Sequence, residues 1–154
     1  VRKAAAQPYQ SLLVAVDFSQ MSQRLVELGS ALQPSARIEL FHAIDTTNEG
    51  KLRYAGVEES ALSGLRINAR RAAAAKMNEL VAQAGVDENR VRRIVVHGEA
   101  TTQVLEHEQA QDCDLIAIGK RGMGMIGEML LGSVTKHILA QSAADVLVAD
   151  RAEA

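Results

Sequence analysis

The sequence is nearly free of cysteine, and its histidines are not grouped. Cys113 is the single cysteine among 154 residues, which excludes an intramolecular disulfide and any metal site built from several cysteines. The histidines at positions 42, 97, 107 and 137 show neither an H-x-x-x-H nor an H-E-x-x-H spacing. We therefore expect no metal ion held by protein side chains alone, and we expect Cys113 to be a small buried residue.

Long apolar runs and an excess of charge are also absent. Hydrophobic residues make up 47% of the chain, but every apolar run is far shorter than the roughly 20 residues that span a bilayer. No positively charged start is followed by an apolar signal core. The 17 Lys and Arg residues nearly balance the 19 Asp and Glu residues, so no overall field attracts nucleic acid or an anionic membrane. We expect a cytoplasmic protein that binds neither nucleic acid nor a membrane.

Two motifs of phosphate binding and catalysis are missing as well. No G-x-x-x-x-G-K-[ST] occurs, which excludes a Walker A loop. No G-x-S-x-G occurs, so the serines, histidines and aspartates of the chain do not indicate a hydrolytic triad.

The segments that are present predict strands that alternate with helices. Five short apolar runs do not alternate with polar residues, which predicts strands covered on both faces: Ser11–Val16, Arg37–Ile44, Val91–Val96, Leu115–Ile118 and Asp145–Ala149. Helical patterns lie between them, at 21–32, 62–84, 101–111 and 133–141. This order predicts a doubly wound α/β domain, a parallel sheet with helices on both faces. The segment 46–59 has no clear pattern, so both a mobile flap and an ordered surface loop remain open there.

A glycine-rich loop follows the fourth expected strand. The chain reads Gly119-Lys120-Arg121-Gly122, then nine residues, then Gly132-Ser133 at the start of a helix. Glycines that take a positive φ or lack a Cβ let phosphate oxygens reach the backbone, and N–H groups of a helix start point at the anion. Lys120 and Arg121 add positive charge. The first hypothesis is therefore nucleotide binding at the carboxyl ends of the strands, where Asp17, Asp45 and Gly98 also fall.

The same loop contains a second glycine pattern. Residues 122–127 satisfy G-x-G-x-x-G, the dinucleotide fingerprint, and Asp150 lies at about the distance of its ribose-binding acid. That fingerprint belongs to the first strand-to-helix turn of a fold, with its first glycine at the strand end. The context therefore disfavours a dinucleotide without excluding it.

The spacing G-x-x-G-x9-G-S resembles the ATP-binding signature of the universal stress protein family. The resemblance continues in segments 12–19, 40–45 and 144–149, so it extends over nearly the whole chain. It implies a five-stranded parallel sheet with strand order 3-2-1-4-5. It also implies an ATP-binding regulatory domain that acts through a protein partner in a stress response, with any Mg²⁺ carried by the phosphates.

The resemblance also implies which residues touch the nucleotide. Asp17 and Ala43 are expected at the adenosine, and the ribose and phosphates are expected at Gly119, Arg121, Gly122, Gly132, Ser133 and Val134. We identify no general base in the phosphate loop, so the resemblance implies at most slow ATP hydrolysis. Whether the protein is an enzyme stays open.

The expected organisation is a single nucleotide-binding domain over residues 11–150, preceded by an extension or linker, 1–10, and followed by a tail, 151–154. With the strand order of the family, Asp145–Ala149 lies at a sheet edge and is expected to pair with itself in a homodimer. Two alternatives remain. One is a dimeric interaction module without a physiological nucleotide, and the other is a hydrolase or transferase that depends on an adenine nucleotide.

Overall fold

A computed structural model describes residues 8–120 and 131–150 of the chain. Its strands are β1 (Ser11–Ala15), β2 (Arg37–Ile44), β3 (Val91–His97), β4 (Leu115–Gly119) and β5 (Asp145–Ala149). Its helices are α1 (Gln20–Leu32), α2 (Glu49–Tyr54), α3 (Glu59–Ala84), α4 (Ala100–Gln111) and α5 (Ser133–Gln141), with a short 3₁₀ turn at Glu88–Arg90. In the described ranges, no helix is long and apolar enough to cross a membrane.

The strands form one parallel sheet in the order β3-β2-β1-β4-β5, which confirms the expected fold. After β1 the chain adds β2 and then β3 on one side, and it then crosses back to place β4 and β5 on the other side. The strand order therefore reverses between β1 and β4. In an open α/β sheet, this reversal leaves a crevice at the carboxyl ends of the central strands.

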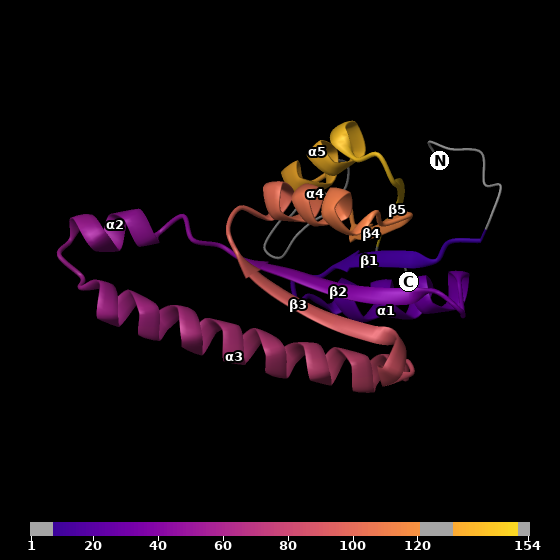
Figure 1. Cartoon of the computed structure of the whole chain (residues 1–154), viewed down its shortest axis with the longest axis horizontal. Coiled ribbons are helices and arrows are strands. Elements are labelled where there is room, and N and C mark those ends of the chain that lie inside the picture. The colour runs from indigo at the N-terminus through magenta and orange to yellow at the C-terminus, as the bar shows by residue number, and fades with distance from the viewer. Residues whose placement is uncertain (1–7, 121–130, 151–154) are drawn as a thin grey trace.

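Helices cover both faces of the sheet (Figure 1). On one face, α1 and α3 bury an apolar layer that includes Leu25, Val26 and Met77 against alternate residues of the strands. On the other face, α4 and α5 contribute Val104 and Ile138 to a second layer. Because both faces are covered, the strands read as nearly continuous apolar runs, which is why the sequence pattern located all of them.

The packing of α1 on β1 is close at a glycine. A Cβ on Gly29 of α1 would lie 2.5 Å from Cδ2 of Leu12, which is shorter than van der Waals contact. The missing side chain therefore lets α1 approach the central strand closely. This contact fixes the helix that starts at the carboxyl end of β1.

Two buried glutamates fix α4 to its surroundings. Glu39 of β2 is fully buried and hydrogen-bonds Nε2 of His107 on α4. Glu108 is 3% exposed, and its Oε1 accepts from the Ser142 hydroxyl and from the N–H groups of residues 143–144. A buried carboxylate needs such donors, because its desolvation is otherwise costly. Glu108 thereby joins α4 to the end of α5.

The segment 46–59, for which the sequence left two interpretations open, contains the helix α2. Arg66 of α3 donates to the Glu49 carboxylate at 3.0 Å and to Glu59 at 3.0 Å, and Arg53 donates to Glu59 at 3.1 Å. The hydrogen bond from Arg66 lowers the pKa of Glu49 below its usual value. No residue of α2 is buried, so ion pairs with α3 rather than an apolar face hold this helix. That is why an apolar periodicity could not predict it.

The residues expected to form an N-terminal extension are partly joined to the domain. Tyr9 packs against the layer under α1 and α3, and its hydroxyl donates to Asp145 at 2.8 Å. The N–H groups of Gln10 and Ser11 both donate to the Asp114 carboxylate. The described part of this extension therefore packs on the sheet before β1 begins.

Candidate functional site

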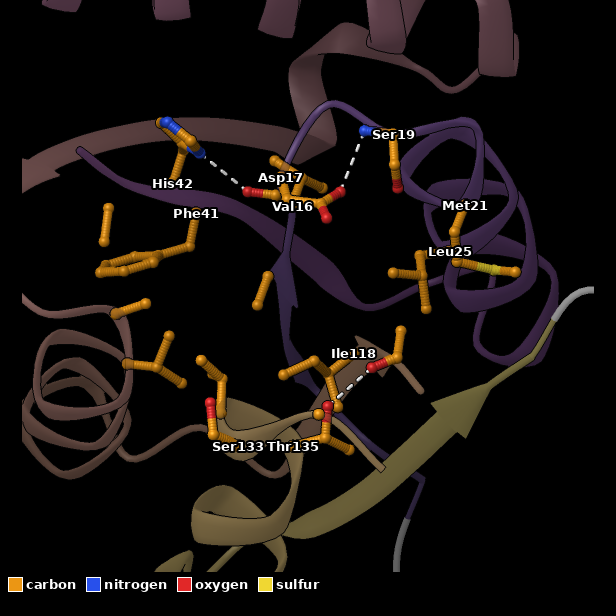
Figure 2. A pocket seen from close by; sticks show the side chains of 17 residues that line it. Val16, Asp17, Ser19, Met21, Leu25, Phe41, His42, Ile118, Ser133 and Thr135 are labelled. Atoms are coloured by element: carbon orange, nitrogen blue, oxygen red, sulfur yellow. Dashed lines mark hydrogen bonds between the residues drawn. The ribbon is translucent and has the colours of Figure 1, made fainter. Parts of the chain in front are cut away.

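A cavity of about 240 Å³ lies where the strand order reverses. Its walls come from the carboxyl ends of the central strands and the starts of α1, α4 and α5 (Figure 2). The lining residues are Ala15, Val16, Asp17, Ser19, Met21, Leu25, Phe41, His42, Ala43, Ala100, Val104, Ile118, Gly119, Gly132, Ser133, Val134 and Thr135. Most of them are apolar, so the cavity suits a flat ring with polar groups at its ends.

Six of the eight predicted site residues line this single cavity: Asp17, Ala43, Gly119, Gly132, Ser133 and Val134. The two others, Arg121 and Gly122, lie outside the described residues, as does the rest of the rival G-x-G-x-x-G pattern. Residues that are more than 100 positions apart in the sequence thus meet because the carboxyl ends of parallel strands share one edge of the sheet.

One end of the cavity is built around Asp17, directly after β1. Asp17 Oδ1 accepts from the Ser19 N–H at 2.9 Å and from the Ser22 hydroxyl at 3.1 Å. Phe18, between them, has a φ of 63°, a conformation that is uncommon for a residue with a side chain. Ser19 is the N-cap residue of α1, so the carboxylate binds the turn before the helix rather than an N–H group of the helix itself. It thereby holds the turn that borders the cavity.

His42 stands beside this turn, and the sequence analysis gave it no role. Its Nδ1 lies 2.8 Å from the Val16 carbonyl oxygen, so that nitrogen carries the proton and donates. Its ring centroid is 4.3 Å from that of Phe18, which in turn lies under Lys76 Nζ at 5.3 Å. The side chain thus joins β2 to the turn after β1. The sequence could have pointed to His42 through its position next to Ala43, near the end of an expected strand.

The other end of the cavity is the first turn of α5 (Figure 2). The N-cap is Gly132, which has no side chain to accept from the free N–H groups of the helix start. In the described part of the chain, no group accepts from the N–H of Ser133 or Val134. These donors and the positive end of the helix dipole face the cavity, which is the arrangement that binds an anion.

The backbone at Gly132 and Gly119 corrects one expectation. Gly132 has φ −60° and ψ 156°, and Gly119 is the last residue of β4, paired with Ala149. Neither glycine has the positive φ that the sequence analysis allowed for. A side chain would be compatible with the backbone at both positions. The property that distinguishes them is the absence of a Cβ next to the cavity.

Lys120, expected to add charge to the loop, is paired with Asp150 just after β5. Its N–H also donates to the Ala149 carbonyl oxygen at 2.7 Å. The rival interpretation used Asp150 as a ribose-binding acid. In the structure this carboxylate binds Lys120 and lies outside the set of cavity residues.

Carboxylates follow three of the strands that end at this edge of the sheet. Asp17, Asp45 and Glu99 follow the ends of β1, β2 and β3. Hydrogen bonds from the hydroxyl and N–H of Thr47 lower the pKa of Asp45. Among the described residues, Asp17 is the carboxylate that lines the cavity, at the end opposite the free N–H donors of α5.

A comparison with models of protein families shows to which family the chain belongs. The model of the universal stress protein family matches residues 8–150. The chain belongs to the universal stress protein family. Among its relatives, the universal stress protein YxiE of Bacillus subtilis is 24% identical over 147 residues, covering 91% of this chain and 98% of YxiE.

Solved structures of other proteins share the fold. The hypothetical protein MJ0577 superimposes with a TM-score of 0.81 at 24% identity, over 96% of this chain and 100% of MJ0577. A universal stress protein in complex with cAMP superimposes with a TM-score of 0.65 at 22% identity, over 94% of this chain and 98% of that protein. These likenesses establish the fold of this universal stress protein.

The cavity residues that sequence reasoning missed are mostly apolar strand ends and the first residues of helices. The signal for several of them was present, because Ala15, Val16 and Ile118 end expected strands. Thr135 is the most informative addition. It is 2% exposed, and its hydroxyl donates to the Gly119 carbonyl oxygen at 2.8 Å, which fixes the first turn of α5 to the end of β4.

We expect Thr135→Val to lower the stability of this universal stress protein. The substitution keeps the volume but removes the hydrogen bond, which contributes about 1 kcal/mol. The midpoint of thermal unfolding should fall by about 2–4 °C in a domain of this size. Circular dichroism melts of Thr135→Val and Thr135→Ser measure it, because serine keeps the hydroxyl. A midpoint of Thr135→Val equal to that of the wild-type protein would show that this hydrogen bond does not stabilise the fold.

Proposed function

We propose that this universal stress protein domain binds an adenine nucleotide, ATP in the first instance, in the cavity between β1, β4 and α5. The base would lie in the apolar part between Asp17 and Ala43, and the phosphates would lie on the first turn of α5. The observation that carries this proposal is the uncapped start of α5 beside an apolar cavity at the point of strand reversal.

The electrostatics of the site favour one orientation of the nucleotide. The phosphates carry the negative charge, and the free N–H groups of Ser133 and Val134 are the matching donors. The carboxylates of Asp17 and Asp45 would repel phosphates but can accept hydrogen bonds from the amino group of a base or from ribose hydroxyls. Of the structurally similar proteins, one binds the nucleotide cAMP, which supports an adenine ligand in this fold.

The residues present fit ATP better as a ligand than as a substrate of fast hydrolysis. In the described part of the phosphate end, the polar side chains of the cavity are the hydroxyls of Ser133 and Thr135. In the described residues, no carboxylate or imidazole lines this end of the cavity itself, so we infer slow turnover at most. Arg121, Gly122 and any Mg²⁺ would add positive charge around the phosphates. The domain would then act as a nucleotide-responsive regulator through a protein partner.

We also infer that β5 forms a homodimer interface. It is the edge strand of the sheet next to β4. The Asp145 N–H donates to the carbonyl oxygen of Asp114, just before β4, and the Ala149 carbonyl oxygen accepts from Lys120, just after β4. Residues 145, 147 and 149 therefore direct their backbone N–H and C=O groups toward β4. Because these directions alternate along a strand, Val146 and Val148 direct theirs to the free edge. Pairing with a second β5 would satisfy them.

ATP is expected to raise the thermal stability of the protein. A ligand at about 100 times its dissociation constant contributes roughly 2.7 kcal/mol, and each kcal/mol moves the midpoint by about 2–4 °C. Differential scanning fluorimetry with ATP, and with NADH as the matched control, measures this shift. A shift with NADH and none with ATP would support the dinucleotide interpretation instead.

The nucleotide that the protein carries can be identified directly. The protein is purified without added nucleotide, denatured, and the supernatant is analysed by liquid chromatography and mass spectrometry. Release of an adenine nucleotide at near one equivalent supports the proposal. Absence of nucleotide, together with no midpoint shift at millimolar ATP, would favour an interaction module, whereas rapid turnover would favour an enzyme.

A further inference from the structure

A second hollow shares Ser133 with the phosphate end of the cavity. It is a groove of about 500 Å³ between α4 and α5. The N-cap residue Glu99 and Thr102 and Glu106 of α4 lie on one side, and Ser133 and His137 of α5 lie on the other. Ser133 lines both the cavity and the groove, and Ala100, next to Glu99, lines the cavity. A phosphate chain that starts on the first turn of α5 therefore has Glu99 as a neighbour across the groove.

Glu99 is held in place by the backbone on both sides of it. The preceding Gly98 has a φ of 144°, which a residue with a side chain rarely adopts, and a Cβ there would lie 3.0 Å from Gln103. The Glu99 carboxylate accepts from the N–H groups of Thr101 at 2.9 Å and Thr102 at 2.8 Å. Partial burial raises the pKa of Glu99, but these hydrogen bonds outweigh it and lower the pKa to about 2. The carboxylate is therefore charged at every physiological pH.

The helices α4 and α5 at this groove differ in whether the N–H groups of their first turns are bound by a cap. The carboxylate of the N-cap residue Glu99 accepts hydrogen bonds from N–H groups in the first turn of α4. Its negative charge compensates the positive end of the α4 dipole. The N-terminus of α5 has a glycine cap and open donors. An anion is thus directed to α5, and each further phosphate that enters the groove comes closer to a fixed negative charge.

We propose that Glu99 limits the negative charge of the nucleotide that the site accepts. This inference rests on the nucleotide binding proposed above. Metal-free ATP carries more charge than AMP, so Glu99 lowers the affinity for ATP more than the affinity for AMP. A divalent cation on the phosphates reduces that charge, so Glu99 makes tight ATP binding depend on the cation.

The test compares dissociation constants of AMP and ATP by isothermal titration calorimetry, in EDTA and in Mg²⁺, at low ionic strength. Glu99→Ser removes the charge but keeps a good N-cap residue, and Glu99→Asp keeps both. Glu79→Ser removes the same charge from the exposed face of α3 and serves as the control. In EDTA, Glu99→Ser should lower the ratio of the dissociation constant of ATP to that of AMP about fivefold. Glu99→Asp and Glu79→Ser should leave this ratio unchanged.

The outcomes separate this inference from the proposed function. If the wild-type protein binds AMP and ATP and the ratio is the same in Glu99→Ser, the inference is wrong while nucleotide binding stands. An equal change of the ratio in Glu79→Ser would attribute the effect to net charge and also overturn it. If the wild-type protein binds neither nucleotide at millimolar concentration, the proposed function fails, and this inference fails with it.

Discussion

Gly132→Val should abolish nucleotide binding while the protein remains folded. The backbone of Gly132, with φ −60° and ψ 156°, is in the region that β-branched residues favour, so valine is compatible with the N-cap position. Its side chain would, however, occupy the space in front of the Ser133 and Val134 N–H groups. Loss of two charge-assisted hydrogen bonds, roughly 1.5–3 kcal/mol each, weakens binding at least about 100-fold.

Calorimetric titration with ATP measures this loss, and far-UV circular dichroism reports the fold. Gly64→Val provides a matched control, because Gly64 lies in α3 and a Cβ there would meet nothing within 4 Å. We expect this control to bind ATP like the wild-type protein. A folded Gly132→Val protein with unchanged affinity would remove the first turn of α5 from the nucleotide site.

Val148→Pro should convert a homodimer into a folded monomer. The N–H of Val148 points to the free edge of β5, so proline removes a donor that a second β5 would use and none that β4 uses. Proline is tolerated on an edge strand when its missing N–H faces outward. Multi-angle light scattering at micromolar concentration should give the mass of two chains for the wild-type protein and of one chain for the variant.

Two further substitutions in β5 make this test specific. Val148→Ala keeps the N–H and should stay dimeric. Leu147→Pro removes an N–H that points to β4, opposite Ala117, and should lower the unfolding temperature in addition to its effect on assembly. A monomeric wild-type protein, or a Val148→Pro variant that remains dimeric, would exclude β5 as the interface.

The location of the strands and long helices was predictable from the sequence, because burial on both faces leaves apolar runs and a helical stripe that local patterns reveal. The strand order came from the resemblance to a family, since an apolar run does not specify its neighbour in the sheet. The helix α2 escaped prediction because the ion pairs of Glu49 and Glu59 with Arg66 hold it. Those pairs join residues that only the packed helices bring together.

The site was partly predictable for a similar reason. Residues that follow strands gather at one edge of a parallel sheet, so Asp17 and the Gly119 loop were placed at that edge before the fold was known. Ala43 came from the resemblance to a family. The roles of His42 and Glu99 were not evident. Each depends on a hydrogen bond whose partner is fixed by a turn with a positive φ, at Phe18 or at Gly98.

The sequence by itself determined the class of fold and the glycine-rich loop, because hydrophobic periodicity and glycine spacing are local properties of a chain. It also determined what the protein lacks, namely a cysteine framework and a Walker A loop. Tertiary structure alone decided which donors remain free. The N–H groups at the start of α5 are open because their cap is Gly132, whereas those of α4 are bound by Glu99. It also decided that the N–H of Leu147 faces inward and that of Val148 outward, since this direction depends on which neighbour a strand pairs with.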